Sequence, residues 1–519
     1  MTILRQGGAA AAVRTVRLQI DGHDVEVAAG TTIFDAAGRL GRALLAPIPT
    51  LCHDPQLVPE PSCEVCLVAV REGERWRMQP SCGTRVVADM EVQTDSDEIR
   101  RARRWALELL LSDHWADCVA PCTLACPAGV DVQGYVDAVR RGAHAEAVSI
   151  IRRTNPLAGV CGRICPHPCE DACRRSLFED SVAINPLKRH AADRCFGSEA
   201  VAEVAARPAS GREVAVIGAG PAGLSAAYFL ALAGHGVVVH DALDAPGGML
   251  RWGIPAYRLP RPVLEADIGV LRGLGVRFVN RWRLGRDGSV ADLREAGFAA
   301  IFLALGAWGG RRLGLEGEDA QGIWGGVEML QAVHEGRLTR LEGRVGVIGG
   351  GNTAIDAART ALRLGAASVD LLYRRDRAQM PAFAHEVAAA EAEGVAIRCL
   401  VAPVGLHLED GRLAAVDLQR MRLGDADASG RARPLPVADS TVAVPLDVLI
   451  RAVGEKPAPP ADLPAGAAAV DAATQASAVA GVFAGGDFVT GPSTAVEAVA
   501  AGRRAAHAID TWLRTGEAH

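Results

Sequence analysis

The chain has 519 residues, of which 49% are hydrophobic and 22% charged, and its formal net charge at pH 7 is -6. At roughly 100 to 200 residues per domain, this length predicts about three to five globular domains. The acidic balance gives no reason to expect nucleic acid as a partner, and no stretch approaches the roughly 18 uninterrupted apolar residues of a membrane span. The start MTILRQGGAAAAVRT lacks the apolar core of a signal peptide. We therefore expect a cytoplasmic protein without a membrane span.

The first 97 residues predict a small unit that combines strands with a helix. From Val13, the run VRLQIDGHDVEVAAG alternates apolar and polar residues around a turn at Asp21-Gly22, which is typical of a β-hairpin. Thr31 or Thr32 can cap the helix TIFDAAGRLG that follows. The runs CLVAVREG and MEVQT predict two more strands.

Twelve of the thirteen cysteines lie in the first 195 residues, and only Cys399 lies beyond them. A reducing cytoplasm disfavours disulfides, so clustered thiols become candidates for metal binding or redox chemistry. The first group is Cys52, Cys63, Cys66 and Cys82. A close Cys-x-x-Cys pair with two distant cysteines is compatible with zinc and with an iron-sulfur cluster, since both use four thiolates.

Residues 98 to about 205 predict a helical domain with loops where cysteines, glycines and prolines gather. Its first segment, DSDEIRRARRWALELLLSD, has the pattern of a capped amphipathic helix. The domain contains the second cysteine group: Cys118, Cys122, Cys126, Cys161, Cys165, Cys169, Cys173 and Cys195.

The stretch EVAVIGAGPAGLSAAYFLALAGHGVVVHD predicts a buried strand, a glycine turn, a helix and a second strand. Gly218 permits the tight turn, Gly220 lets a pyrophosphate approach the backbone, and Gly223 lets helix and strand lie close together. The helix N-terminus then faces the phosphates. Asp241 ends the second strand, where an acid can accept hydrogen bonds from a ribose. The alternative is a structural glycine turn.

A second unit of this kind begins at GRVGVIGGGNTAIDAARTALRLGAASVDLLYRR. It has Gly349 and Gly351, with Ala354 in the third position. Its second strand ends in Arg374 and Arg375, and guanidinium groups suit a 2′-phosphate. The pattern favours NADPH, with NADH as the alternative if the two arginines only form a solvated turn. The last segment, GVFAGGDFVTGPSTAVEAVAAGRRAAHAI, can return to the first nucleotide fold.

Several motifs in this order resemble one family. They are GAGPAGL, PGGMLRWGIPAYRLP, LALGA, GGGNTAIDAAR, YRR with MPA, AVGEKP, and GVFAGGD with GPSTAVEA. Over about residues 113 to 515, the chain resembles the small subunit of bacterial glutamate synthase. It also resembles the flavin and NADPH domains of dihydropyrimidine dehydrogenase and the large subunit of the electron-bifurcating transhydrogenase.

The resemblance implies an α/β fold in which an NADPH-binding Rossmann-like domain (341–450) is inserted into an FAD-binding one (211–340 and 451–515). By matching position, it implies that FAD contacts Gly218, Ala219, Gly220, Pro221, Ala222, Gly223, Asp241, Gly248, Arg258, Gly486, Asp487 and Thr494. It likewise implies that the pyridine nucleotide contacts Gly349, Gly350, Gly351, Asn352, Thr353, Arg374, Arg375 and Gly454.

Residues 15 to 97 resemble the N-terminal 2Fe-2S domain of the complex I large iron-sulfur subunit and of iron-only hydrogenases. The resemblance includes the CEVCLVAV strand after the ligand loop. It implies a β-grasp domain over residues 13–97, with Cys52, Cys63, Cys66 and Cys82 as ligands of a 2Fe-2S cluster.

In the helical domain (98–205), the glutamate synthase pattern implies two 4Fe-4S clusters with interleaved ligands. The family's first two cysteines would fall on His114 and Asp117, so the pattern departs here. The complex I type domain has a histidine followed by three cysteines at such a helix end. We therefore expect Cys118, Cys122 and Cys173 to hold one cluster with His114 as fourth ligand; the alternative is that His114 is a cap or a solvated side chain.

Cys126, Cys165 and Cys169 are expected to hold the other cluster. The family places a Glu or Gln about fifteen residues after the last cysteine, and here that position falls on Lys188, a poor ligand for iron. Cys161 is the nearest substitute and Cys195 the alternative. Cys161 can also be a small buried residue without a ligand role.

A flavin can exchange electrons singly or in pairs, so these parts form a chain from NADPH through FAD to the clusters, or the reverse. No catalytic side chain is required for that hydride transfer. We expect an electron-transfer flavoprotein subunit whose partner is a catalytic subunit of glutamate synthase, formate dehydrogenase, aldehyde oxidoreductase or hydrogenase type, with ferredoxin as a further candidate. A disulfide reductase of thioredoxin reductase type would need a Cys-x-x-Cys in the nicotinamide domain, which has only Cys399. A zinc scaffold is the other alternative.

Overall fold

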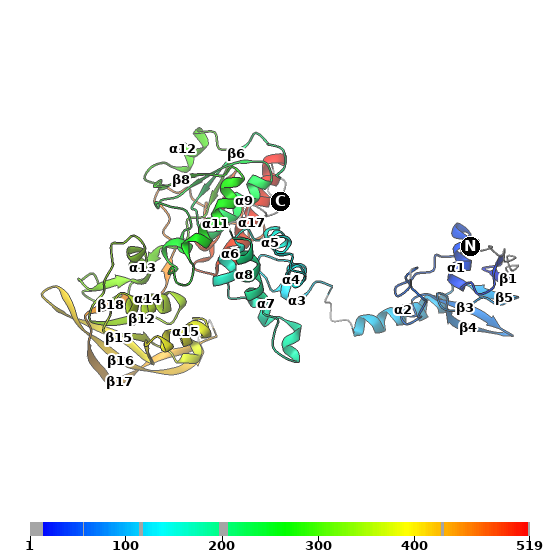
Figure 1. Ribbon diagram of the computed structural model, residues 1–519, viewed down its shortest axis with the longest axis horizontal. Coiled ribbons are helices and arrows are strands. Elements are labelled where there is room, and N and C mark those ends of the chain that lie inside the picture. The colour runs from blue at the N-terminus through cyan, green and yellow to red at the C-terminus, as the bar shows by residue number, and fades with distance from the viewer. Residues whose placement is uncertain (1–13, 56, 114–117, 197–205, 427–429, 517–519) are drawn as a thin grey trace, which may run out of the picture. The chain divides into compact units, whose positions relative to one another are not determined.

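The computed structural model describes residues 14–55, 57–113, 118–196, 206–426 and 430–516. Its contacts divide the chain into two compact units, one from Met1 to Cys118 and the other from Val119 to His519 (Figure 1). Each unit has its own hydrophobic core. Among the described residues, no helix is both long enough and apolar enough to cross a bilayer.

The first unit is a five-stranded mixed sheet with two helices. Its elements are β1 (Thr15–Ile20), β2 (His23–Ala28), α1 (Ile33–Gly38), β3 (Leu67–Glu72), β4 (Arg75–Pro80), β5 (Met90–Gln93) and α2 (Asp97–Ser112). The strand order is β2-β1-β5-β3-β4, in which β1 and β5 run parallel and the other neighbours antiparallel. This arrangement agrees with the β-grasp domain expected from the resemblance.

The predicted hairpin is confirmed. Asp21 and Gly22 both have positive φ, 51° and 78°, as a two-residue turn with the right twist requires. Thr32 caps α1 by accepting a hydrogen bond from Asp35 N. Strand β4, by contrast, was not predicted. Its sequence RWRMQP is polar and its residues are exposed or half-buried, because it lies at the sheet edge beside β3.

Helix α2 belongs to the first unit, although its residues from 98 onward were expected in the helical cysteine domain. The buried Arg103 explains the difference, since its Nε donates to the carbonyl of Leu67 at 2.9 Å and its Nη2 to that of Thr94 at 3.1 Å. Ser96 caps the helix by accepting from Ile99 N.

The second unit begins with the short helices that bear the cysteines. They are α3 (Pro121–Leu124), α4 (Val132–Arg140), α5 (His144–Arg152), α6 (Ala158–Ile164), α7 (Pro168–Asp171) and α8 (Ile184–Arg194). Their apolar faces share one core with the first nucleotide fold, which runs from Cys126 and Val160 to Phe302 and Ile509. The cysteine helices therefore belong to the same body as the first nucleotide fold.

The first nucleotide fold is a parallel sheet of order β20-β9-β6-β7-β8. Its strands are β6 (Glu213–Ile217), β7 (Gly236–His240), β8 (Arg277–Val279), β9 (Ala300–Leu303) and β20 (Val482–Ala484). Its helices are α9 (Pro221–Leu232), α10 (Met249–Trp252), α11 (Arg261–Gly273), α12 (Val290–Glu295), α16 (Asp487–Thr490) and α17 (Ala495–Thr515). Nearly all residues of β6, β7 and β9 are buried, as expected of parallel strands covered on both faces.

The second nucleotide fold lies in sequence between β9 and β20, although these two strands are neighbours in the first sheet. Its own parallel sheet has the order β11-β18-β12-β13-β14. The elements are β11 (Ile323–Gly325), α13 (Gly326–His334), β12 (Arg344–Ile348), α14 (Asn352–Arg363), β13 (Ser368–Tyr373), α15 (Ala384–Ala392), β14 (Ala396–Cys399) and β18 (Val448–Arg451). This connectivity agrees with the expected insertion of one nucleotide-binding domain into the other.

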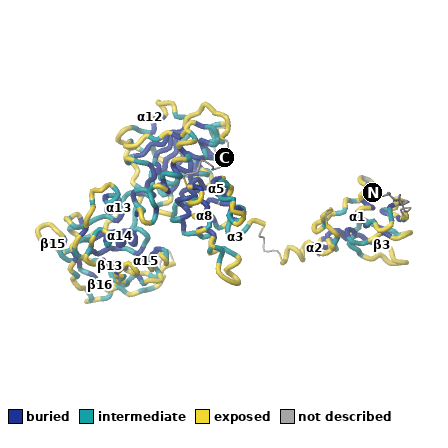
Figure 2. Tube along the Cα trace, viewed as in Figure 1, coloured by how far each residue is buried: buried dark blue, intermediate teal, exposed yellow. Residues whose placement is uncertain are grey.

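Two further pieces complete the inserted fold. An antiparallel sheet of β15 (Val401–Glu409), β16 (Arg412–Ala426) and β17 (Ala432–Pro445) extends from it and is largely exposed or half-buried (Figure 2). Strands β10 (Gly309–Gly310) and β19 (Glu455–Lys456) pair where the chain enters and leaves the insertion. The two crossings are therefore joined by backbone hydrogen bonds.

Candidate active site and metal centres

The turn between β6 and α9 has the geometry of a phosphate-binding loop. Gly218 has a φ of 107°, and a Cβ there would lie 2.2 Å from the carbonyl oxygen of Ala304. A Cβ on Gly223 would lie 1.9 Å from the oxygen of Gly218. Gly220, in contrast, faces open space and caps α9, whose first residue is Pro221. The three glycines thus have the separate roles that their spacing predicts.

One cavity of about 760 Å³ extends from this turn to the second nucleotide fold. Nine of the twelve predicted flavin contacts line it: Gly218, Gly220, Pro221, Ala222, Asp241, Gly248, Arg258, Asp487 and Thr494. Asn352 and Thr353 of α14 line the same cavity. Ala219, Gly223 and Gly486 lie behind the wall; a Cβ on Gly486 would be 2.8 Å from the Cβ of Ala222. The residues and the space suit a dinucleotide, since ligand cavities are about 300 to 1,000 Å³.

Asp241 lies at the end of β7, where the sequence predicts a ribose partner. Its carboxylate accepts hydrogen bonds from Ala219 N at 2.6 Å and from Leu243 N at 2.8 Å. Burial raises the pKa of this carboxyl. The side chain therefore already holds the glycine turn in place, and a ribose contact remains a prediction.

Asp487 opens α16 on the wall of the cavity. Burial raises the pKa of its carboxyl to about 6, although a hydrogen bond from Ser493 N at 3.2 Å acts in the opposite direction. Thr494 begins the long helix α17 with a capping box, in which its side chain accepts from Glu497 N. The N-terminus of α17 thus also opens on the cavity.

In the second nucleotide fold, the glycine turn lies as close to the neighbouring backbone as it does in the first. Gly349 has a φ of 142°, and a Cβ there would lie 2.2 Å from the oxygen of Ala452. A Cβ on Gly350 would lie 2.6 Å from the Tyr373 ring, whereas Gly351 has only one distant neighbour. Gly454 has a φ of 107°, and its carbonyl accepts from Arg311 N.

The two predicted 2′-phosphate ligands differ in their surroundings. Arg374 is exposed after β13, whereas Arg375 is only 4% exposed. The Arg375 Nε donates to the carbonyl oxygen of Ala432 at 2.9 Å and thereby ties β13 to β17. Arg374 is therefore the freer of the two to meet a phosphate.

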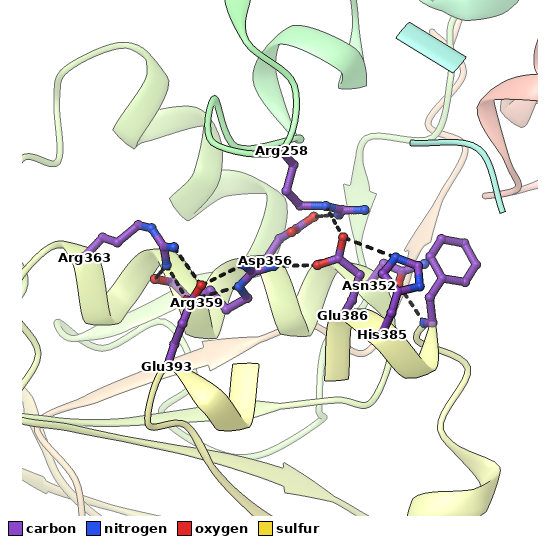
Figure 3. A network of polar contacts seen from close by, with 9 residues as sticks. Arg258, Asn352, Asp356, Arg359, Arg363, His385, Glu386 and Glu393 are labelled. Carbon is purple, nitrogen blue, oxygen red and sulfur yellow. Dashed lines mark hydrogen bonds and ion pairs between the residues drawn. The ribbon is translucent and has the colours of Figure 1, made fainter. Parts of the chain in front are cut away.

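A buried charge network joins the two nucleotide folds (Figure 3). Arg258, in the loop before α11, lies 2.6 Å from Asp356 of α14 and 2.8 Å from Glu386 of α15. Arg359 continues the network to Glu386 and Glu393. Burial raises the pKa of Asp356 to about 7, although Arg258 lowers it. This pairing is not evident from the sequence, because Arg258 and Asp356 are 98 residues apart and belong to different folds.

Tyr257 adds an aromatic contact to the same junction. The guanidinium carbon of Arg363 lies 3.9 Å from the centre of its ring and that of Arg359 lies 4.9 Å from it. Both arginines belong to α14, whereas Tyr257 precedes Arg258 in the flavin-binding fold. Cation-π contacts of this kind contribute about 0.5 to 2 kcal/mol each.

The first cysteine group gathers around the loop before β3 and the turn after β4. Cys63, Cys66 and Cys82 are buried and Cys52 is exposed. Backbone amides of Ser62 and Cys63 lower the pKa of Cys52 to about 7, whereas burial and then Cys66 raise that of Cys82 to about 12. The four thiols thus influence one another as the donors of a single thiolate-bound cluster do, and the donor set suits a 2Fe-2S cluster.

The thiols of the second group influence one another to different extents. Burial is the main cause that raises the pKa of Cys169 to about 12, and Cys165 and Cys126 act in the same direction. Cys122 has a different neighbour, since Cys173 adds to the effect of burial on its pKa. Cys126, Cys165 and Cys169 thus influence one another, and Cys173 influences Cys122; their division between two clusters remains a prediction.

The remaining members differ in position. Cys161 is fully buried beside Cys165, and its Sγ lies 3.8 Å from Asn155 Oδ1. Cys195 is buried near Arg152, and Cys118 is exposed. Of the two candidate fourth ligands, Cys161 is therefore next to the Cys165 set. His114 lies outside the described residues.

All thirteen cysteines are free thiols. Among the described residues, no group of three or more His, Cys, Asp or Glu side chains is arranged so that it could hold a single metal ion.

Asp267 of α11 fixes the cysteine helix α6 to the flavin-binding fold. It accepts a hydrogen bond from Val160 N at 3.0 Å and lies 3.5 Å from Arg152 of α5. The carboxylate thus binds the N-terminal turn of α6 directly beside Cys161, where a negative charge is favoured. This contact too was not evident in the sequence.

Three family models match the chain. The pyridine nucleotide-disulphide oxidoreductase model matches residues 212–502. The model of dihydropyrimidine dehydrogenase domain II, with a 4Fe-4S cluster, matches residues 112–200, and that of the 2Fe-2S iron-sulfur cluster binding domain matches residues 13–97. These matches agree with the order of modules expected from the sequence.

Several curated proteins are similar to the chain. The β subunit of the NADP(+)-dependent formate dehydrogenase of Moorella thermoacetica is 44% identical over 76% of this chain and 60% of its own length. The β subunit of the NADPH-Fe(3+) oxidoreductase of Geobacter sulfurreducens is 40% identical over 77% and 64%. The glutamate synthase [NADPH] small chain of Escherichia coli is 34% identical over 78% and 90%. The chain thus spans less than two thirds of the first two relatives.

Among solved structures, FprA of Mycobacterium tuberculosis in complex with NADPH has a TM-score of 0.51 at 19% identity, covering 60% of this chain and 85% of that one. This likeness supports the fold of the two nucleotide-binding parts. The chain therefore belongs to the pyridine nucleotide-disulphide oxidoreductase family, in the group of the glutamate synthase small chain, and contains modules that match 2Fe-2S and 4Fe-4S domains.

Proposed function

We propose that the chain is the electron-transfer flavoprotein subunit of a larger oxidoreductase, in which electrons pass between NADPH, FAD, two 4Fe-4S clusters and a 2Fe-2S cluster. The observation that carries the proposal is the single cavity lined by both nucleotide folds, with Gly218 and Asp487 on one side and Asn352 and Thr353 on the other. When bound, FAD supplies the exchange between paired and single electrons.

The protein's own residues contribute binding and orientation. The glycine turns bring backbone amides to the phosphates, and the Arg258 network holds the nicotinamide-binding fold against the flavin-binding fold. The wall of the cavity also includes the apolar side chains of Ile217, Leu250 and Trp308. No side chain has to act as an acid or base.

The cysteines bind the iron-sulfur clusters, which carry electrons one at a time. Cys52, Cys63, Cys66 and Cys82 hold the 2Fe-2S cluster. Cys126, Cys165, Cys169 and Cys161 hold one 4Fe-4S cluster, and Cys118, Cys122, Cys173 and His114 the other. The cysteine helices and the flavin-binding fold share one hydrophobic core, which supports a short path for electrons between the 4Fe-4S clusters and the flavin.

We further propose a cytoplasmic location and a catalytic partner subunit. Thirteen free thiols suit a reducing compartment. Two of the relatives are themselves called β subunits, one of a formate dehydrogenase and one of an Fe(3+) oxidoreductase. Glutamate synthase, aldehyde oxidoreductase and hydrogenase subunits, or ferredoxin, are the other candidates.

The test is anaerobic purification from the native host, followed by metal analysis, visible and EPR spectra, and identification of the co-purifying subunit. We expect a brown protein with FAD, whose flavin absorption bleaches on addition of NADPH and whose cluster EPR signals then appear. A colourless protein that contains zinc would contradict the proposal, as would a flavin that NADPH reduces without reduction of any cluster.

A further inference from the structure

Lys188 is a lysine in the interior of the cysteine-bearing region. It lies in the middle of α8 and is only 3% exposed. Lysines are rarely buried so completely without a negative partner. In the part of the chain that the structure describes, no carboxylate lies within ion-pair distance of its ammonium, so its partner has to be sought among other groups.

The position of Lys188 is fixed by close contacts of α8 with α6 and α7. A Cβ on Gly162 would lie 2.8 Å from the Cα of Arg189, so only a glycine lets the two helices approach at this point. Asn185 donates through Nδ2 to the oxygen of Gly162 at 3.3 Å and through its backbone N to Glu170 Oε1 at 2.7 Å. Lys188 is therefore held against the helices that carry Cys161 and Cys169.

The electrostatic effect of Lys188 reaches three thiols. Burial raises the pKa of Cys161, Cys165 and Cys169, and in each case the Lys188 ammonium lowers it. Cys161 and Lys188 are also the chain neighbours of Gly162 and Arg189, where α6 and α8 approach each other closely, so this buried charge lies beside the groups proposed to hold one 4Fe-4S cluster. An ammonium has no lone pair to give to iron, so it cannot replace the Glu or Gln that the family has at this position.

We propose that Lys188 is a positioning residue for electron transfer, whose fixed positive charge raises the reduction potential of the cluster held by Cys126, Cys161, Cys165 and Cys169. The inference rests on the proposed function, in which these thiolates bind a 4Fe-4S cluster. Reduction adds one electron to the cluster and breaks no bond. A neighbouring positive charge stabilises the more negative, reduced form, and net charge is one of the factors that set cluster potentials.

The test uses the anaerobically purified holoprotein and its Lys188→Met, Lys188→Gln and Lys188→Arg variants. Iron and sulfide content and an EPR-monitored redox titration are measured for each. We expect Lys188→Met to keep its iron, while at a fixed ambient potential the ratio of reduced to oxidised cluster falls at least about tenfold for one 4Fe-4S signal, which equals about 59 mV for one electron. The other signals and the Lys188→Arg protein should keep the wild-type potentials.

Arg189→Met is the matched control, since it removes the same charge one residue further along α8. The Arg189 side chain is 58% exposed and lies 3.6 Å from Asp193, so its effect is screened by water. We expect no shift of any cluster potential in this variant.

Three results would overturn the inference. One is a full-iron Lys188→Met protein with wild-type potentials. Another is an equal shift in Arg189→Met, and the third is loss of the cluster from both Lys188→Met and Lys188→Gln. Failure of the proposed function is a different result, because the wild-type protein itself would then lack 4Fe-4S signals.

Discussion

The Arg258 guanidinium lies 2.6 Å from the Asp356 carboxylate, and this buried ion pair joins the flavin-binding fold to the nicotinamide-binding fold. Both side chains are at most 10% exposed. Removal of one partner from such a pair leaves an uncompensated buried charge, which costs about 3 to 5 kcal/mol. The packing of the two nucleotide folds against each other therefore depends on this pair, because neither charge can be solvated by water if the other is removed.

The first prediction concerns this pair. We expect Arg258→Gln to lower the midpoint of thermal unfolding and to slow the reduction of the flavin by NADPH, as measured by calorimetry and stopped-flow absorption. The double variant Arg258→Gln/Asp356→Asn should recover part of the stability, because it removes both charges. Arg340→Gln is the control, since the pair of Arg340 with Glu342 is 77% and 66% exposed and contributes at most about 1 kcal/mol. The prediction would be contradicted if the loss of stability in the double variant equalled the sum of the losses in Arg258→Gln and Asp356→Asn.

The second prediction concerns pH. Burial raises the pKa of Asp356 from 3.8 to about 7, so between these values the folded protein binds a proton that the unfolded chain has lost. The contribution of Asp356 to stability therefore falls as pH rises through this window, by at most about 1.4 kcal/mol per pH unit, and is constant above it. We therefore compare the midpoint of thermal unfolding of Asp356→Asn with that of the wild type. The variant's midpoint minus the wild-type midpoint should increase from pH 5 to 7 and stay constant from pH 8 to 9. A constant difference from pH 5 to 9 would show that Asp356 does not titrate there.

The third prediction separates the two arginines after β13. Arg374 is exposed, so Arg374→Gln should raise the KM for NADPH about tenfold or more while KM for NADH stays unchanged, since a hydrogen bond to a charged group contributes about 1.5 to 3 kcal/mol. Arg375→Gln should instead lower thermal stability, because its bond to Ala432 is lost. Arg377→Gln, which removes an exposed ion pair with Glu391, is the control for a general loss of charge. A wild-type kcat/KM for NADH that equals or exceeds that for NADPH would contradict the phosphate role of Arg374.

The fourth prediction concerns the first cysteine group. We expect Cys66→Ser to lose the 2Fe-2S EPR signal and two irons per chain, with FAD content and the 4Fe-4S signals retained, because the two units have separate cores. Cys399→Ser should change neither iron nor FAD, since that thiol lies in the nicotinamide-binding fold. Zinc in place of iron in the wild-type protein would show that the thiol spacing was misread.

Local features were predictable from the sequence where one stretch contains the whole signal. The hairpin at Asp21-Gly22 and the two glycine turns have such signals. The insertion of one nucleotide fold into the other was expected only from the family resemblance, because it pairs strands far apart in the sequence. Strand β4 was missed because an edge strand with polar residues has no apolar alternation. The Arg258–Asp356 pair and the burial of Lys188 could not be predicted, since they depend on which helix faces which residue in space.

The insertion also has a consequence for the order of folding. Strand β20 completes the first sheet beside β9, and α17 packs on α9, where a Cβ on Gly502 would lie 2.1 Å from the oxygen of Ala222. During synthesis, the inserted fold can form from its own sheet while the flavin-binding sheet still lacks this edge strand. The flavin-binding fold can close only after β20 and α17 have emerged, so chains that stop within the insertion expose an unpaired strand and are prone to aggregate.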